Sequence, residues 1–310
     1  MPAVHDVAPE LMWAAVSHTA VRPNSATAAG TAFRTHRFRL DNRESDIPDP
    51  AEEFIAASRL RRWDRATSRS ITDYFGDDMT MVRSRLDREA QAETPRVPLP
   101  QPVPLRVALS DVVMRRRSVR QFRATPVPLG DLGAVLRHCA AITAQADEDL
   151  ARPSDGMPFA TTGFRAVPSA GGLFPVEVWV AAHRVSGLAP GVYRYLPGDD
   201  ALAFHDDDAA IARLHATLIA DDGVQVGAAA FLLLLVARPW RSMRKYGPRG
   251  LRFVMHEAGA ISFAAHLAVT ALDLGAVDYS GFYDEEANQV LGLDGFFDAL
   301  AHVVVVGVPR

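Results

Sequence analysis

The segment GAAAFLLLLVARP, residues 227–239, decides the fold class, because it is an uninterrupted apolar run of strand length. Such a run predicts a strand that is buried on both faces of a sheet. A second run of this kind, HVVVVGVP, occupies residues 302–309. Between the two, residues 253–276 place apolar side chains at helical spacing, and the flanks of that stripe are also apolar. We therefore expect a helix there that is buried in a core or in a subunit interface.

The segments that precede these runs alternate between strand and helix patterns. VEVWVAAHRV at residues 176–185 and GVYRYLP at residues 191–197 have strand patterns, the second introduced by a glycine turn. Helical patterns occupy residues 106–117, 129–144 and 208–219. The sequence therefore predicts a mixed fold of helices and strands.

The first hundred residues differ in texture from the rest. Residues 49–75 predict a charged helix, and prolines follow at positions 95, 98, 100, 102 and 104. Proline cannot continue a helix or a central strand, so these residues predict an extended connector of the polyproline type. We place the domain boundary there, between an N-terminal extension (residues 1–105) and a main domain (residues 106–310).

The composition is that of an ordinary globular protein, with 48% hydrophobic and 23% charged residues in a chain of 310. A net charge of -4 offers no general attraction to nucleic acid or to an anionic membrane. No segment has the roughly 18 consecutive apolar residues of a membrane span, so we expect a cytoplasmic protein. The single cysteine, Cys139, excludes an internal disulfide and a thiolate metal cluster, and its apolar surroundings predict a packed thiol. The histidines show no metal-ligand spacing, so we expect no metal site.

A cluster of arginines in RRRSVRQF, residues 115–122, is the first candidate binding segment. Guanidinium groups present a planar fork of donors that matches phosphate oxygens, and a serine hydroxyl adds another donor. The candidate phosphate clamp consists of Arg116, Arg117, Ser118 and Arg120. The alternative is a solvated helix end whose positive charges suit the C-terminal dipole.

The second candidate is the loop PSAGG at residues 168–172, which leads into the strand pattern at Val176. Two consecutive glycines let the backbone come close to a flat or anionic ligand, because no side chain intervenes and positive φ is tolerated. The alternative is a tight turn before the strand. The loop does not match the glycine patterns of nucleotide-binding loops.

The third candidate is Lys245, the only lysine among the 33 basic residues. It precedes Tyr246 in a polar connection, residues 238–253, between an apolar strand and an apolar helix. Desolvation or nearby cations can lower the pKa of a lysine amine toward neutrality, whereas arginine keeps its proton. The alternative is a surface lysine beside a strand-end aromatic residue. His256 and Glu257, which follow, are either a polar pair near the site or satisfied core groups.

These segments occur in the order and approximate spacing of the nitroreductase-like flavoproteins, together with GLAPGVYRYLP at residues 187–197 and LGAVDYSGFYDEEANQVLGLDG at residues 274–295. More narrowly, the chain resembles the SagB-type dehydrogenases, the azoline oxidases of ribosomal peptide natural-product clusters, over about residues 106–308. The resemblance implies an α+β fold in three layers, with a central mainly antiparallel sheet flanked by helices. It also implies an intertwined homodimer that holds FMN at its interface.

The resemblance assigns roles to residues that match the family's motifs. Arg116, Ser118 and Arg120, with Arg117 beside them, match the segment on the FMN phosphate and ribityl chain. The loop that lies along the flavin, contributed by the other subunit, is matched by Pro168, Ser169, Ala170, Gly171 and Gly172. Gly281 and Phe282 match a pair placed near the isoalloxazine ring. Many relatives also hold the phosphate with basic residues after the last strand, where this chain has Arg310.

Lys245 and Tyr246 match the catalytic pair of the azoline oxidases. Conversion of a thiazoline or oxazoline into an azole removes one hydride, which FMN can accept, and one proton, which needs a base. The resemblance therefore implies an FMN-dependent dehydrogenase that acts on an azoline-containing peptide, reoxidised by dioxygen. The alternatives are an NAD(P)H-dependent nitroreductase or quinone-type oxidoreductase, and a flavin-stabilised scaffold of a peptide-modifying complex. The helix predicted in the N-terminal extension either packs on the dimer, binds a leader peptide or contacts a cyclodehydratase partner.

Overall fold

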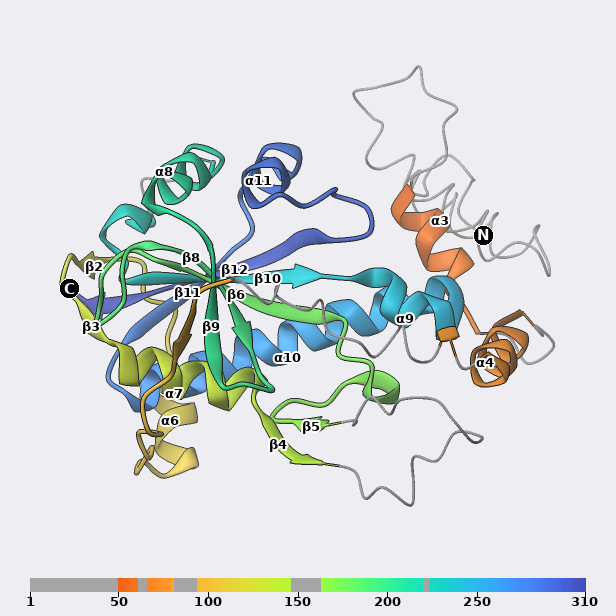
Figure 1. Ribbon diagram of the computed structural model, residues 1–310, viewed down its shortest axis with the longest axis horizontal. Coiled ribbons are helices and arrows are strands. Elements are labelled where there is room, and N and C mark those ends of the chain that lie inside the picture. The colour runs from red at the N-terminus through yellow and green to blue at the C-terminus, as the bar shows by residue number, and fades with distance from the viewer. Residues whose placement is uncertain (1–49, 61–65, 78, 81–93, 146–162, 220–222) are drawn as a thin grey trace, which may run out of the picture.

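The computed structural model has a central sheet with helices on both faces (Figure 1). It describes residues 50–60, 66–77, 79–80, 94–145, 163–219 and 223–310. The α+β fold with a central antiparallel sheet, expected from the sequence, is confirmed.

All neighbouring strands of the central sheet are antiparallel, in the order β1-β9-β8-β6-β10-β12-β11, with β2 paired to β12. Its strands are β1 (Arg96–Pro98), β2 (Phe122–Arg123), β6 (Val176–Ala182), β8 (Gly191–Leu196), β9 (Ala201–Asp206), β10 (Phe231–Ala237), β11 (Gly275–Tyr279) and β12 (Ala299–Pro309). Two small sheets pair β3 (Val127–Pro128) with β7 (Val185–Ser186), and β4 (Ile142–Gln145) with β5 (Gly163–Arg165).

Strand β10 separates two hydrophobic cores, and every one of its residues is buried. Phe231, Leu233 and Leu235 face the core that contains α7 and α10. Leu232 and Leu234 face the core that contains α8 and α11. This alternation is the period of two that a strand imposes on its side chains. The prediction of a strand buried on both faces is confirmed.

The helices form the outer layers of the fold (Figure 1). One face of the sheet carries α7 (Leu129–Ala140) and the long α10 (Gly250–Ala271), with α6 (Leu109–Arg115) against α10. The other face carries α8 (Asp208–Ala216) and α11 (Asp284–Leu291). At the N-terminal end of α10 lie α9 (Pro239–Tyr246), α3 (Pro50–Ala57) and α4 (Ala66–Gly76). No helix in the described part of the chain is both long and apolar enough to cross a bilayer.

Three predicted elements differ from those in the structure. The charged helix predicted over residues 49–75 is interrupted, because residues 58–60, which follow α3, are not helical, and α4 begins at Ala66. The helix predicted over residues 129–144 ends at Ala140, because Ala141 is extended and the next residues pair as β4 with β5. The polar connection at residues 238–253 is helical instead. Pro239 occupies the first turn of α9, where its missing N–H costs no hydrogen bond. A 3-10 turn at residues 247–249 then leads directly into α10.

The proline-rich residues 95–104 include the edge strand of the central sheet. Residues Arg96–Pro98 form β1, which pairs with β9 at the end of the strand order. An edge strand tolerates proline because one side needs no ladder hydrogen bonds. The division into residues 1–105 and 106–310 stays a prediction. Cys139 is fully buried, which raises the pKa of its thiol to about 12 and agrees with a packed, unreactive side chain.

The corner between α9 and α10 depends on Gly250. A Cβ there would lie 2.7 Å from the backbone nitrogen of Met243 and 2.7 Å from the carbonyl carbon of Ser242. We expect Gly250→Ala to lower the free energy of unfolding by about 1–3 kcal/mol, because backbone atoms must move apart. Denaturant titration measures this loss.

Gly259→Ala on the same helix is the matched control, since a Cβ at Gly259 meets nothing within 4 Å. We expect this variant to be more stable by roughly 0.5–1 kcal/mol, the ordinary gain of alanine over glycine inside a helix. Equal stability of the two variants would contradict the close packing of the corner.

Candidate functional site

Lys245 and Tyr246 occupy the last turn of α9, against the glycine loop. Lys245 is only 8% exposed, and Tyr246 is half-buried. A Cβ placed on Gly171 would lie 3.0 Å from Lys245 Nζ and 2.5 Å from Tyr246 Oη. Gly171 also has a φ of 68°, which glycine adopts without strain. The structure therefore brings together two segments that are far apart in the sequence, and only glycine fits between them.

Three aromatic rings surround the Lys245 amine. Its Nζ lies 5.4 Å from the ring centroid of Tyr246, 5.2 Å from that of Tyr74 and 4.5 Å from that of Phe75. Burial raises the pKa of Tyr246, and Tyr74 raises it further, so Tyr246 keeps its phenol proton. Sequence reasoning missed Tyr74 and Phe75, because they belong to the charged helix of the N-terminal extension and no local pattern relates them to Lys245.

Glu257 lies beneath the glycine loop. Its Oε1 accepts a hydrogen bond from the Val176 amide at 3.2 Å, where the loop enters β6. Burial raises the pKa of Glu257 to about 7, partly opposed by Ser169, by the Val176 amide and by the charges of Arg165 and Arg241. Glu257 is thus a buried group that links α10 to the loop. It forms no pair with its neighbour His256, which is exposed.

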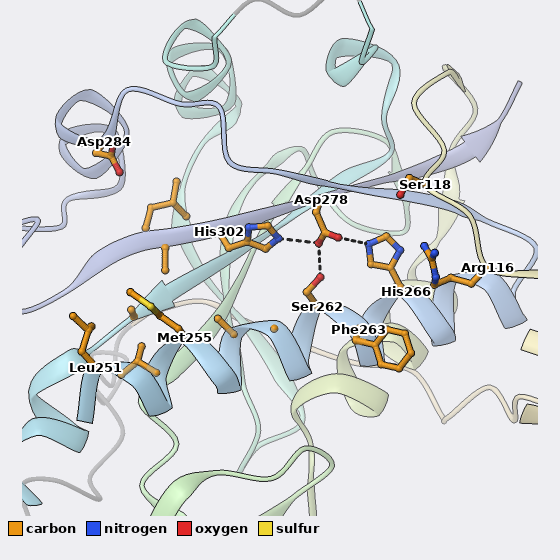
Figure 2. A pocket seen from close by; sticks show the side chains of 16 residues that line it. Arg116, Ser118, Leu251, Met255, Ser262, Phe263, His266, Asp278, Asp284 and His302 are labelled. Carbon is orange, nitrogen blue, oxygen red and sulfur yellow. Dashed lines mark hydrogen bonds and ion pairs between the residues drawn. The ribbon is translucent and has the colours of Figure 1, made fainter. Parts of the chain in front are cut away.

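A cavity of about 860 Å³ runs along the face of α10 (Figure 2). Leu251 and Met255 line one end, whereas Arg116 and Ser118 line the other. Residue 251 and His266 are separated by about 22 Å along the helix, at 1.5 Å per residue. The volume falls in the range of about 300–1,000 Å³ that is typical of ligand pockets. Two residues of the predicted clamp, Arg116 and Ser118, therefore line the far end of a cavity that begins near the Lys245 corner.

A network of hydrogen bonds centred on Asp278 forms the wall of this cavity (Figure 2). The carboxylate accepts from His302 Nε2 at 2.8 Å and from the Ser262 hydroxyl, and His266 Nε2 lies 3.2 Å away. These three partners hold the pKa of Asp278 below its usual range. His302 Nε2 is the donor in its contact with Asp278, because an ionised carboxylate can only accept, and His302 Nδ1 lies 2.8 Å from the Ser280 hydroxyl. Asp278 is thus a stable negative charge in the cavity wall.

A β-bulge in β12 directs His302 toward Asp278. Leu235 of β10 faces His302, whereas Val236 faces Leu300, so Ala301 is the extra residue. Bulges of this kind redirect side chains and recur beside active sites. The sequence contained one signal of this network: Asp278 is the only charged residue of β11, at a position whose side chain shares the face of Ala276.

The other two residues of the predicted clamp, Arg117 and Arg120, do not line the large cavity. Arg117 is exposed, and its Nη1 donates to the carbonyl oxygens of Met114 and Arg116, as the solvated helix end would predict. Arg120 lines a smaller hollow of about 370 Å³, which it shares with Gly281 and Asp278.

The last two predicted positions lie at the edge of this region. Phe282 is 7% exposed and packs in the core on the α8 side of the sheet, beyond the hollow that Gly281 lines. Arg310 is exposed, and its amide donates to the Gln121 carbonyl beside Arg120.

The predicted residues thus form two groups at opposite ends of α10. The loop of residues 168–172 and the pair Lys245 and Tyr246 lie at its N-terminal end. Arg116 and Ser118 lie at its C-terminal end, where Ser118 bridges to Ala276 of β11. Within the described part of the chain, no group of three or more histidine, cysteine or acidic residues is suited to hold a metal ion.

An antiparallel sheet between helical layers defines an α+β fold, and an arginine and a serine line its long cavity. The model of the nitroreductase family matches residues 113–308, and the chain belongs to this family. It is therefore a nitroreductase-family oxidoreductase, and members of the family generally bind the flavin FMN.

The chain is also similar to individual proteins and solved structures. A nitroreductase-family protein of Methanocaldococcus jannaschii, MJ1384, is 32% identical over 185 residues, which cover 60% of this chain and 84% of the relative. A nitroreductase-type structure from Ralstonia eutropha JMP134 is 24% identical, with a TM-score of 0.56 over 73% of this chain and 95% of that chain. The structure of the E. coli microcin synthetase McbBCD complex, with truncated pro-MccB17 bound, matches at 19% identity and a TM-score of 0.52, over 86% of this chain and 100% of that chain. Both solved structures share the fold of this chain.

We expect the raised pKa of Glu257 to make the stability of the protein depend on pH. Between roughly pH 4.5 and 7 the folded protein holds a proton that the unfolded chain has released, so the free energy of unfolding falls as the pH rises through this window. Above pH 7 the penalty is on the order of 3 kcal/mol. Glu257→Gln removes the titration, so its melting temperature should fall less than that of the wild type between pH 5 and pH 8.

Glu285→Gln, on the exposed first turn of α11, is the matched control. It should keep the pH dependence of the wild type. Parallel melting curves for Glu257→Gln and the wild type across this window would contradict the assignment.

Proposed function

We propose that this protein is an FMN-dependent dehydrogenase that oxidises thiazoline or oxazoline rings of a peptide precursor to thiazoles or oxazoles. One observation carries the proposal: the only lysine of the chain is buried beside a tyrosine, against a glycine loop at the end of the cavity helix. A reaction that removes a carbon-bound proton needs a positioned base. The match to a chain of the E. coli microcin synthetase complex with truncated pro-MccB17 bound supports a peptide substrate.

The reaction removes one hydride and one proton from neighbouring carbons of the ring. FMN, when bound, would accept the hydride. The neutral amine of Lys245 accepts the proton, and burial disfavours the ammonium form of a lysine. Tyr246 keeps its phenol proton, so it can donate a hydrogen bond toward the ring heteroatom. The surrounding rings keep water away from the amine.

The residues at the far end of the cavity fit an FMN phosphate. Arg116 offers a planar fork of donors, Ser118 offers a hydroxyl, and both line the cavity. Farther along the cavity, Ala258 and Gly259 leave space on α10 for a flat ring system. We assign Arg116 and Ser118 to the phosphate, with Arg120, Arg117 and Arg310 as nearby positive charges.

A homodimer would unite the two groups of residues. They lie at opposite ends of α10 in one chain, too far apart to act on one ligand. The free face of α10 carries Met255 and Phe263, which are 57% and 53% exposed. A two-fold axis across this face would set the N-terminal end of one α10 beside the C-terminal end of the other. Each site would then combine Arg116 and Ser118 of one subunit with the glycine loop and Lys245 of the other.

The proposed partners follow from the same comparison. The match to a chain of a synthetase complex supports a peptide substrate and a partner protein. We propose that the peptide already carries azoline rings and that the partner is the cyclodehydratase that forms them. The second candidate function is an NAD(P)H-dependent nitroreductase, favoured by the 32% identity to MJ1384. Anaerobic bleaching of the bound flavin by NADPH would favour this second function, because an azoline dehydrogenase draws its electrons from the peptide.

We expect Lys245→Ala to lower kcat for azoline oxidation by about 10²–10⁴-fold, the usual contribution of a general base. Tyr246→Phe should lower kcat less, because only one hydrogen bond is lost. The flavin absorption spectrum of each purified variant should match that of the wild type, since neither residue is assigned to the phosphate. Normal turnover by Lys245→Ala would overturn the assignment of the base.

A site built from residues of two subunits leads to a second prediction, which concerns mixed dimers. Arg116→Ala and Lys245→Ala should each be inactive alone, whereas the mixed dimer obtained by co-expression under two affinity tags should have about half of wild-type activity, because one of its two sites is intact. Tandem purification of the mixed dimer followed by an azoline assay measures this. A mixed dimer as inactive as its parents would contradict a site built from two subunits.

A further inference from the structure

We propose that Tyr74 and Phe75 of α4 complete the pocket of Lys245 and act as positioning residues for its amine. Both lie outside residues 113–308, the region that the nitroreductase family model matches. Their catalytic meaning rests on the function proposed above, but the contact itself does not. The N-terminal extension would then be part of the active site.

Both rings lie close to the Lys245 amine. Phe75 is the nearer ring, with its centroid 4.5 Å from Lys245 Nζ, and Tyr74 follows at 5.2 Å. The two rings meet edge to face at a centroid distance of 5.4 Å, a favourable geometry for aromatic pairs. Side chains that are packed closely against their neighbours stay in one rotamer. The rings therefore hold the lysine side chain in one place.

Hydrogen bonds tie the extension to α9 and α10. Arg252 donates to the Ser58 hydroxyl at 2.8 Å and to the Ile55 carbonyl at 3.1 Å. Arg249 donates to the Ser58 carbonyl at 3.1 Å. Figure 1 shows α3 and α4 beside α9 at the same end of α10. These two arginines, which follow Lys245 by four and seven residues, thus anchor the extension.

A further hydrogen bond reaches α9 from α4. The Ser70 hydroxyl donates to the carbonyl of Arg244, the residue before Lys245, at 3.2 Å. Since Ser70 and Phe75 belong to one helix, this bond fixes the rings relative to the amine.

The two rings differ in exposure, which gives them different roles. Tyr74 is 1% exposed and forms the fixed inner wall of the pocket. Phe75 is 54% exposed, so its outer face is open to a ligand. A flat azoline ring that approaches Lys245 would stack on that face. Loss of the Tyr74 ring should lower kcat, whereas loss of the Phe75 ring should chiefly raise KM for the peptide.

The lone lysine allows a direct test. Lys245 and the α-amino group are the only amines that an acylating reagent, acetic anhydride, can modify in the intact protein, and hydroxylamine removes acetyl groups from tyrosine. Peptide mass spectrometry measures the acylation rate of Lys245, with the α-amino group as internal reference. We expect Phe75→Leu to raise this rate by about fivefold or more, because the ring that covers the amine is lost and the amine becomes accessible.

Two further variants make the test specific. Phe204→Leu, on the distant β9, also removes a partly exposed phenylalanine and should leave the Lys245 rate unchanged. Tyr74→Phe keeps the ring and should label as the wild type does. Equal rates in the wild type, Phe75→Leu and Phe204→Leu would overturn the proposal.

The outcome is separable from the function proposed above. Faster acylation in Phe75→Leu would support the aromatic cover, and normal azoline oxidation by Lys245→Ala would at the same time reject Lys245 as the base. Slow acylation in the wild type that Phe75→Leu does not change, with Lys245→Ala inactive, would keep the base and reject the cover.

Discussion

The burial of β10 on both faces is the constraint from which the rest of the structure follows. Its seven residues alternate between two cores, and each buried leucine contributes about 1.5–3 kcal/mol relative to exposure. A strand covered on both sides leaves polar groups room only beyond its ends. The chain therefore places Lys245 in the helix that follows β10, outside the sheet, where a buried corner forms against the glycine loop and α4.

Helix α10 links the chemistry to the binding cavity. Its buried face packs on the sheet, and its free face lines the cavity from the Lys245 corner to Arg116. Three of its buried polar residues connect it to neighbouring strands and loops. Glu257 meets the loop before β6, and His266 and Ser262 meet Asp278. The same helix therefore supports two half-sites, and the proposed dimer is the arrangement that joins them.

Much of the fold could be predicted because strand and helix periodicities are local. The runs at 227–239 and 302–309 and the stripe at 253–276 all became the expected elements. The elements that differed depend on distant partners: β4 exists through its pairing with β5, and α9 packs against α10 and α4. Of the candidate site, Lys245 could be identified because it is chemically exceptional in an arginine-rich chain, whereas Tyr74 and Asp278 resemble ordinary residues until their neighbours are known.

The sequence by itself determined the class of fold, the buried central strand, the unusual lysine and the glycine loop that needs no side chain. Each of these properties follows from residue type and short-range spacing. Only the tertiary structure decided that Gly171 lies against Lys245 and Tyr246, that two rings from the N-terminal extension cover the amine, and that two histidines hold Asp278 ionised. These contacts join residues up to about 170 positions apart, and local patterns carry no information on such distances because they arise from how the layers pack.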